Sequence, residues 1–292
     1  MHDFNIEHRH VLQEEDFRGC CLDCRRSLEI IKPHVMAFYR RIRGYTRQDL
    51  AALPVDELYR LYQALDDIAH LNVGDHLAGL ILKESQIRRA LPTIRAYYAA
   101  FFSLHEIHQA RRVADAQDPR AALETFPLYE RYRALIRSQV EAYPLPRGAR
   151  VAFIGCGPFP VSIVLLAGMH GVRCVGLDTD PEAVALARRC VGRLGLADRV
   201  SILRGDESAL EGLEWDTVVV AALAEPKARI FRTLRRLLEG REGARVCLRT
   251  YTGIRAVLYH PVRQEDLQGF RRVAEIAPAG RVNNTLVFLE RA

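Results

Sequence analysis

The spacing of apolar residues divides the chain into a helical first half and an alternating second half. Up to about residue 145, apolar residues recur at helical intervals and predict helices over residues 14–32, 54–68, 75–91, 92–113 and 126–141. The first of these is expected to stop before Pro33, because proline has no backbone N–H to donate. Asp118-Pro119 reads as a helix cap followed by a first-turn proline. The segment Tyr143–Gly148 contains two prolines and a glycine, which mark a linker.

Beyond residue 149, short apolar runs alternate with helical segments. The runs predict strands over residues 151–154, 174–178, 200–203, 217–221 and 245–248. Helices are expected between them over residues 161–168, 181–194 and 226–238. This alternation indicates a parallel sheet with crossover helices. Two last runs, 270–276 and 284–289, predict an antiparallel hairpin added to the sheet, so the expected domains are residues 1–145, helical, and residues 146–292, built on the sheet.

The loop after the first predicted strand carries the signature of a nucleotide-type ligand. It reads Gly155-Cys156-Gly157, and the next apolar run ends in Asp178. Glycines let a strand turn tightly against a ligand, and an acidic side chain after the second strand can hold both hydroxyls of a ribose. Prolines at 158 and 160 remove N–H donors where a diphosphate would need them. The loop therefore favours S-adenosylmethionine (SAM), which has no phosphates, over NAD.

An antiparallel edge on a doubly wound sheet is characteristic of SAM transferases. The expected fold class is α/β, a Rossmann-like class I SAM-transferase sheet preceded by an all-helical N-terminal domain. The residues expected to bind the cofactor are Gly155, Gly157, Pro158, Asp178, Asp206 and Ala222. Asp206 follows the third strand, where a carboxylate can approach the adenine amino group, and a surface helix cap is its alternative role. Asp180 is expected to cap the helix that begins at Pro181.

Composition narrows the class of protein. The chain has 292 residues, of which 49% are hydrophobic, enough for one large or two modest domains. It contains no run of about 18 apolar residues, and its first ten residues lack the apolar core of a secretory signal, so we expect a cytoplasmic protein with no membrane partner. The net charge is +6, but no dense basic run is present and no nucleic-acid partner is expected.

Cysteine and histidine spacing gives no metal site. The seven cysteines are scattered, and the single CxxC within Cys20–Cys24 lacks the second pair that a structural zinc site normally needs. The role of Cys20, Cys21 and Cys24 is left open. His105 and His108 stand three residues apart without a third ligand, which indicates residues lining a pocket or lying at the surface.

Five segments, in order, resemble the nicotianamine synthase family, chiefly its shorter archaeal form. They are Phe153–Pro160, Gly205–Glu207, Val220–Lys227, Arg249–Arg255 and Val282–Thr285. The resemblance extends from about Leu91 to the C-terminus and is much less clear over the first seventy residues. It implies transfer of the 3-amino-3-carboxypropyl (aminobutyryl) arm of SAM to an amine, with release of methylthioadenosine and without a metal. Bacterial relatives are implied to transfer one arm to histidine, on the way to opine-type metallophores such as staphylopine and pseudopaline.

Glu106 is the candidate general base. An α-amine is largely protonated at neutral pH and needs a base before it can attack. On a helix, Phe102 and Tyr98 lie one and two turns before Glu106, and aromatic neighbours would raise the pKa of its carboxyl group. Periodicity alone leaves a solvated helix residue as the alternative. The resemblance places the family's proposed catalytic glutamate at Glu106, and it gives Tyr132 an assisting role that competes with a simple place in the core.

The remaining candidates are expected to contact the amino-acid substrate. They are Tyr98, Tyr129, Arg249, Tyr251 and Arg255. The last three follow the fifth strand, near the edge of the sheet where ligands bind, and could engage a carboxylate. Structural pairing is the alternative for each of these three residues, and a place in the aromatic core is the alternative for Tyr129. Lys227 is expected in the first turn of its helix, facing solvent or a carboxylate.

The sequence therefore favours an aminobutyryl transferase that forms nicotianamine or a nicotianamine-like metallophore from SAM. A single transfer to L- or D-histidine is the first alternative. A conventional methyltransferase is the second, although the loop Ala221–Glu225 lacks the Asn-Pro-Pro-Tyr type of clamp. A catalytically dead SAM-binding protein is the third. The acceptor, the number of transfers, the metal that the product chelates and the oligomeric state stay open, with a homodimer among the options.

Overall fold

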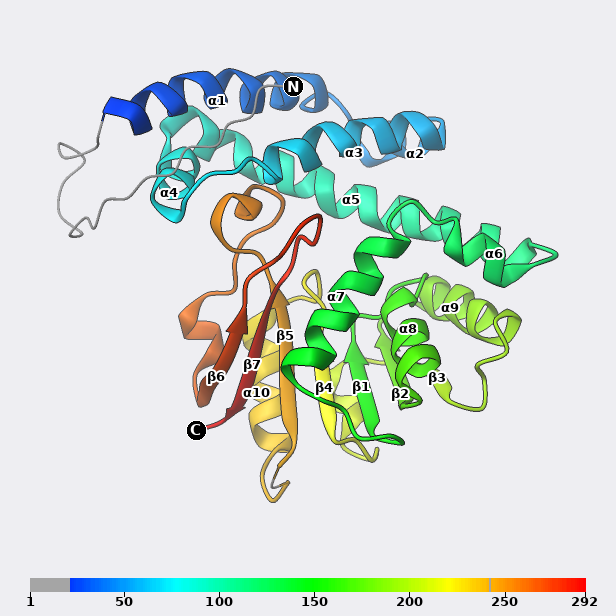
Figure 1. Cartoon of the computed structure of the whole chain (residues 1–292). Helices are drawn as coiled ribbons and strands as arrows, with labels where there is room; N and C mark the ends of the chain where they lie inside the picture. The colour runs from blue at the N-terminus through cyan, green and yellow to red at the C-terminus, as the bar shows by residue number, and fades with distance from the viewer. Residues whose placement is uncertain (1–21, 242) are drawn as a thin grey trace. The chain divides into compact units, whose positions relative to one another are not determined.

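The computed structural model describes residues 22–241 and 243–292, and its contacts divide the chain into two compact units (Figure 1). The first unit extends through Phe102 and also includes Tyr251–Pro261. The second unit comprises Ser103–Thr250 and Val262–Ala292. The sequence pattern changes near residue 145, whereas the compact units divide within a helix. The helical residues after Phe102 belong to the second unit because they pack with its sheet and helices.

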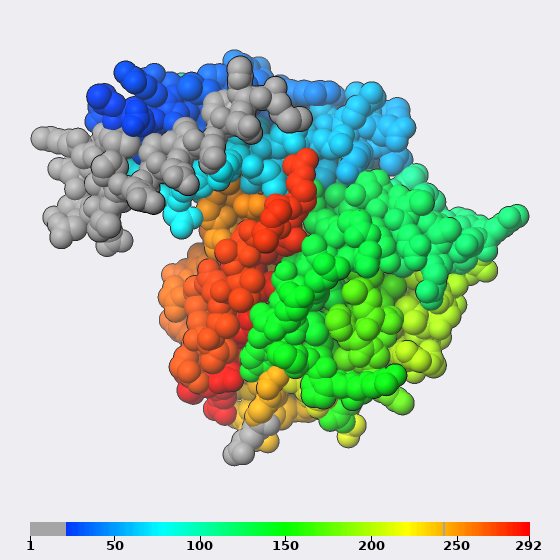
Figure 2. Space-filling view, viewed as in Figure 1, coloured from blue at the N-terminus to red at the C-terminus, as the bar shows by residue number. Residues whose placement is uncertain are grey.

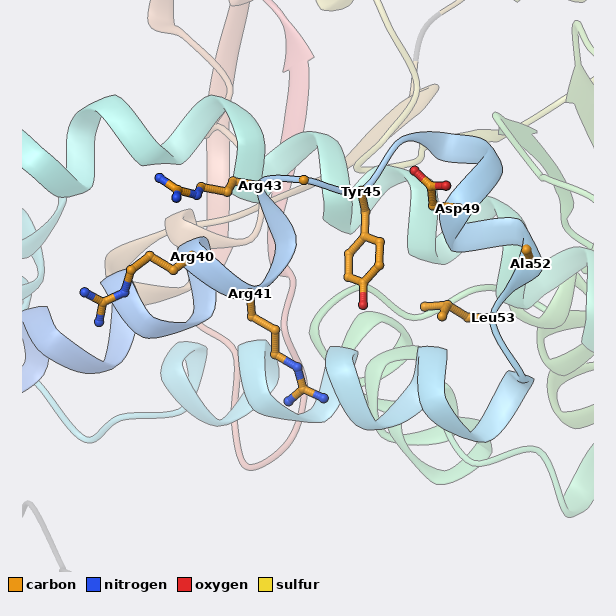
Figure 3. A pocket seen from close by; sticks show the side chains of 8 residues that line it. Arg40, Arg41, Arg43, Tyr45, Asp49, Ala52 and Leu53 are labelled. Atoms are coloured by element: carbon orange, nitrogen blue, oxygen red, sulfur yellow. The ribbon is translucent and has the colours of Figure 1, made fainter.

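The first unit is a set of helices around an aromatic core. Its elements are α1 (Leu22–Ile42), α2 (Arg47–Ala52), α3 (Val55–Ala69), α4 (Asp75–Lys83), the first part of α5 (Ser85–Asp115) and the 3-10 helix η3 (Gly253–Val257). Tyr62 of α3 stacks on Phe101 of α5 with ring centroids 4.2 Å apart. Three arginines and Tyr45 surround a hollow at the end of α1 (Figure 3). Basic side chains are favourable there because they face the negative end of the helix dipole.

Two predicted helix boundaries are wrong. Helix α1 runs through Pro33, which is exposed, so the carbonyl of Glu29 that loses its N–H partner can be hydrated. Helix α5 likewise runs through the exposed Pro92, and the break lies earlier, at Glu84. The Glu84 carboxylate accepts hydrogen bonds from the N–H groups of Gln86 at 2.7 Å and Ile87 at 2.8 Å, which caps the start of α5. Residues 14–21 of the first predicted helix lie outside the described residues.

The second unit contains a seven-stranded sheet in the order β3-β2-β1-β4-β5-β7-β6. The strands are β1 (Arg150–Ile154), β2 (Arg173–Asp178), β3 (Val200–Arg204), β4 (Thr217–Val220), β5 (Arg245–Thr250), β6 (Phe270–Ile276) and β7 (Thr285–Arg291). The first five are parallel to one another, and β7 is antiparallel to both β5 and β6. The predicted parallel sheet with an antiparallel hairpin is confirmed.

Helices cover both faces of this sheet. They are α7 (Tyr129–Ala142), α8 (Val161–His170), α9 (Pro181–Arg193) and α10 (Lys227–Leu237). The second unit also contains the short helix α6 (Pro119–Glu124) and the 3-10 turns η2 (Glu207–Leu210) and η4 (Gln264–Leu267). Figure 1 shows α7 and α8 in front of the strands and α10 behind them. At the end of α7, Tyr143 stacks on Phe288 of β7 at 5.1 Å, and Figure 2 shows the surfaces of these two elements side by side. No helix in the described ranges combines the length and apolarity needed to span a bilayer.

Candidate active site

The turn after β1 requires glycine at two positions. Gly155 and Gly157 have φ values of +77° and +67°, a conformation that other residues rarely adopt. A Cβ at Gly155 would lie 2.9 Å from the Cβ of Ala224, and a Cβ at Gly157 would lie 2.7 Å from Oε2 of Glu106. The turn is held to the next strand, since the N–H groups of Gly155 and Cys156 both donate to the carbonyl of Leu177. The missing side chains thus leave space that neighbouring groups occupy.

Asp178 is oriented by backbone donors at the end of β2. The N–H of Gly157 donates to its Oδ2 at 2.9 Å, and the N–H of Asp180 donates to its Oδ1 at 3.0 Å. Each carboxylate oxygen keeps an acceptor position, so the pair can still receive two adjacent hydroxyl groups. The side chain of Asp180 accepts from the N–H of Glu182 at 2.9 Å, which confirms its predicted role as the cap of α9.

Glu106 meets the glycine turn from α5. The hydroxyl of Tyr132, on α7, donates to Oε1 of Glu106 at 3.4 Å, while Oε2 lies against Gly157. Burial raises the pKa of Glu106 to about 8; the hydrogen bond from Tyr132 lowers it, and the negative charge of Asp178 adds a smaller rise. A carboxyl group with a pKa near neutrality can take a proton from an ammonium group and release it again. These properties suit the predicted role of Glu106 as a general base, and that role stays a prediction.

An aromatic cluster that the sequence did not reveal packs against Tyr132, the hydrogen-bond partner of Glu106. The ring of Phe126 lies 5.2 Å from Phe159, edge to face, and 6.0 Å from Tyr132. The Phe126 ring also lies 5.6 Å from the ring of His105. Burial lowers the pKa of His105 to about 4, with smaller contributions from His108 and Arg112. His105 is therefore neutral at pH 7. Phe126 and Phe159 carry no distinctive sequence signal, because their importance lies in contacts between distant segments.

Two other predicted cofactor residues have roles in loop structure. Asp206 caps η2, accepting from the N–H of Ser208 at 3.0 Å, and the hydrogen bonds from Ser208 hold its pKa below the usual range. The alternative role as a helix cap is thus observed, and contact with adenine stays a prediction. The carbonyl of Ala222 accepts from Nζ of Lys227 at 3.0 Å.

Comparison with known proteins places these residues in a family. A sequence model described as "Nicotianamine synthase protein" matches residues 25–292. The chain belongs to the nicotianamine synthase family. The resemblance predicted from five segments is confirmed, and the match also includes the segment from residue 25 to about 70, where it was less clear.

Solved structures of this family share the fold. A crystal structure of a mutant of the nicotianamine synthase MtNAS in complex with S-adenosylmethionine has 32% sequence identity and a TM-score of 0.83. The aligned region covers 94% of this chain and 99% of the MtNAS chain. MtNAS in complex with MTA and tNA matches equally well, with the same identity and TM-score. The predicted Rossmann-like SAM-transferase fold is therefore confirmed.

The curated proteins similar to this chain include two kinds of enzyme. L-histidine 2-aminobutanoyltransferase of Pseudomonas aeruginosa is 30% identical over 141 residues, 48% of this chain and 53% of the relative. Nicotianamine synthase 1 of Hordeum vulgare is 33% identical over 226 residues, 72% of this chain and 67% of the relative. The chain thus spans about half the length of the first relative and two thirds of the second.

Arg249 and Tyr129, predicted to bind substrate, have structural neighbours within the second unit. The buried guanidinium of Arg249 donates to Oγ of Ser162 at 2.7 Å and to Oε1 of Gln139 at 3.1 Å. Tyr129 begins α7, and the guanidinium of Arg133 lies 5.8 Å from the centre of its ring. Structural pairing is thus observed for Arg249, and substrate contact by either residue stays a prediction.

The other three predicted substrate residues lie in the first unit. The hydroxyls of Tyr98 and Tyr251 are 3.0 Å apart, and their rings meet edge to face at 5.8 Å. Both tyrosines are buried, whereas Arg255 is half-buried in η3. Arg95 of α5 holds this segment through a hydrogen bond of 2.7 Å to the carbonyl of Ala256. Their contacts bind the segment after β5 to α5, and their role toward substrate stays a prediction.

Lys227 lies beside a carboxylate, one of the two settings predicted for it, and is buried. It lies in the first turn of α10, as predicted, but its side chain is only 5% exposed. Of the two predicted settings, solvent or a carboxylate, the second is observed, because the ammonium turns back into the loop that precedes the helix. Its Nζ lies 3.3 Å from Oε1 of Glu225, so the expected carboxylate neighbour is present.

Metal-ligating side chains are dispersed in the described part of the chain. Residues 22–241 and 243–292 contain no group of three or more His, Cys, Asp or Glu side chains placed to hold a metal ion. His105 is buried and His108 exposed, so the pair does not share one environment. Cys24 is buried, whereas Cys20 and Cys21 lie outside the described residues.

Proposed function

We propose that this protein is a SAM-dependent aminobutyryl transferase that forms nicotianamine or a nicotianamine-like metallophore. The observation that carries the proposal is the position of Glu106, whose carboxylate touches the glycine turn that also binds Asp178. A ligand held by the glycine turn and Asp178 would therefore lie beside a carboxyl group with a pKa of about 8. Membership of the nicotianamine synthase family and the SAM-bound MtNAS structure support the choice of ligand.

Each transfer in the proposed reaction forms one carbon–nitrogen bond and breaks one carbon–sulfur bond. The free amine of the acceptor attacks the methylene carbon that joins the aminobutyryl arm to the sulfonium. The electron pair of the broken bond goes to sulfur, and neutral methylthioadenosine leaves. The sulfonium activates all three of its carbons, so the position of the amine decides which group moves.

In this proposal Glu106 takes the proton of the attacking amine. A base accepts a proton at pH 7 to 8 and passes it on most readily when its own pKa lies near that pH. The Tyr132 hydroxyl orients the Glu106 carboxylate through Oε1. Asp178 would hold the ribose hydroxyls of SAM, because its two oxygens are already aligned by the N–H groups of Gly157 and Asp180.

A second candidate keeps the chemistry and changes the acceptor. The Pseudomonas aeruginosa relative, 30% identical over 141 residues, is named L-histidine 2-aminobutanoyltransferase. In that reading one aminobutyryl arm passes from SAM to the α-amine of histidine, and the product is the precursor of an opine-type metallophore. The same base and the same leaving group serve both acceptors.

Incubation of the purified protein with SAM, alone and with L- or D-histidine, separates the candidates by mass spectrometry. Methylthioadenosine with nicotianamine supports the first proposal, and methylthioadenosine with a histidine adduct supports the second. S-adenosylhomocysteine would show methyl transfer and overturn both.

Glu106→Gln tests the base directly. Turnover is expected to fall by at least about a hundredfold, the usual contribution of a general base, while SAM still binds. Glu130→Gln is the matched control, because Glu130 is an exposed α7 residue paired with Arg133 at the surface. Full activity in Glu106→Gln would remove Glu106 from the mechanism.

A further inference from the structure

The loop between β4 and α10 packs directly against the glycine turn. Its first residue, Ala221, donates a backbone hydrogen bond of 3.0 Å to the carbonyl of Ile154, the last residue of β1. Ala224 then lies so close to Gly155 that a Cβ at Gly155 would be 2.9 Å from its own Cβ. The position of this loop therefore sets one wall of the proposed SAM site.

The side chains of this loop offer little that could hold it in place. From residue 221 to 224 it reads Ala-Ala-Leu-Ala, without a polar side chain. Its carbonyls are gathered instead by the ammonium of Lys227, which donates to Ala222 at 3.0 Å and also to Ala224. Glu225 Oε1, at 3.3 Å, is the third acceptor, so the three ammonium protons have three partners.

A buried lysine at this position is unfavourable in free energy unless its hydrogen bonds to the loop compensate. A cation in the first turn of a helix faces the positive end of the helix dipole, where an acidic residue would be favoured. Burying an ammonium also requires full pairing. Glu225 is 32% exposed, so an ion pair with it could form at the surface without burying Lys227. The burial is explained by the two loop carbonyls, which only an inward-turned ammonium reaches.

We propose that Lys227 is a positioning residue for cofactor binding. Its ammonium holds the loop Ala221–Pro226 in the position in which Ala224 packs against Gly155. The inference rests on the proposed use of SAM. The ammonium of Lys227 donates to the loop that forms one wall of the site, whereas Glu106 and Tyr132 lie on α5 and α7. Lys227 is therefore expected to affect the affinity for SAM more than the chemical step. Asp266, the other acidic group whose charge acts on Lys227, is already paired with Arg263.

The test is SAM binding by calorimetry, together with steady-state kinetics, on Lys227→Met. Methionine keeps the apolar stem but is one atom shorter than lysine and has no donor, so the carbonyls of Ala222 and Ala224 lose their partner. The Kd and KM for SAM are expected to rise about tenfold, while kcat at saturating SAM stays within about threefold. Lys227→Gln retains donors on a side chain one atom shorter, so its Kd should lie between those of the wild type and Lys227→Met.

Leu234→Ala is the control for general destabilisation, because Leu234 is a fully buried core residue of the same helix, α10. It should lower the melting temperature without changing the Kd for SAM. An unchanged Kd in Lys227→Met, or an equal rise in Leu234→Ala, would overturn the inference. If Lys227→Met does not fold, an unchanged Kd in Lys227→Gln would overturn it too. Wild-type protein that fails to bind SAM would instead overturn the proposed function, and this inference with it.

Discussion

The carboxylate of Glu106 occupies the space that a side chain at Gly157 would need. Its Oε2 lies 2.7 Å from the position of a Cβ at that glycine, which is shorter than any ordinary contact between such atoms. Gly157→Ala should therefore displace Glu106, and the backbone, with φ at +67°, would be strained as well. We expect kcat/KM to fall by about a hundredfold, the typical effect of moving a catalytic group by roughly 1 Å.

Gly168→Ala is the matched control for that substitution. Gly168 lies within α8, and apart from its chain neighbours and the backbone of its own helix no atom lies within 4 Å of the Cβ it would gain. Alanine is the better helix former, so this variant should be more stable by about 0.5–1 kcal/mol and fully active. Equal activities for the two glycine variants would show that Glu106 tolerates displacement.

Tyr132→Phe should change the pH dependence of turnover. The hydroxyl of Tyr132 donates to Glu106 and lowers the pKa of its carboxyl group, so its removal raises that pKa further. The acid limb of the pH profile of kcat/KM should shift to higher pH by about half a unit, since the hydrogen bond at 3.4 Å is long. Tyr143→Phe, which alters a tyrosine stacked on Phe288, should leave the profile in place. A shift to lower pH in Tyr132→Phe would contradict the role given to this hydroxyl.

Glu106→Gln should stabilise the protein at alkaline pH. The pKa of Glu106 is about 8 in the folded protein and 4.5 in its ordinary setting. Between these values the folded protein keeps a proton that the unfolded chain has lost, so the free energy of unfolding falls as pH rises. Glutamine does not titrate and avoids this loss. Its advantage should be near zero at pH 4 and should approach an upper value of about 5 kcal/mol at pH 8.5.

Urea denaturation of the unliganded protein across this pH range measures the difference. The upper value assumes complete burial, and Glu106 is partly accessible, so the observed gain should be smaller. Glu130→Gln should follow the wild type at every pH because Glu130 is exposed. A constant difference between Glu106→Gln and the wild type would mean that the carboxyl group titrates normally.

Arg229→Met should destabilise the second unit through Glu207. The carboxylate of Glu207 is 2% exposed and receives hydrogen bonds from Arg229 at 2.8 and 3.2 Å. Without Arg229 a buried charge loses its main partner, and the expected loss is about 3 kcal/mol. Adding Glu207→Gln should recover part of it. Thermal unfolding of both single variants and the double variant gives the coupling, and strictly additive losses would show that the pair is not coupled.

Several features of this protein follow from its sequence because their causes are local. A buried parallel strand reads as a short apolar run, and each such run from Val151 onward became a strand. Gly155 and Gly157 predict a turn with positive φ, and Asp180 before Pro181 predicts a helix cap. These signals depend on a few adjacent residues, so they can be recognised without knowledge of the rest of the fold.

The tertiary structure decided what depends on contacts between distant segments. Helices α1 and α5 continue through Pro33 and Pro92 because packing of their buried faces outweighs one lost hydrogen bond. Lys227 turns inward because the carbonyls of Ala222 and Ala224 lie there. The sequence suggested Glu106 as a base, but only the approach of α5 to the turn after β1 places its carboxylate against Gly157, where burial and Asp178 raise its pKa. Helical periodicity assigns a side chain to a face of its helix, whereas the partner on that face is set by the packing of the whole unit.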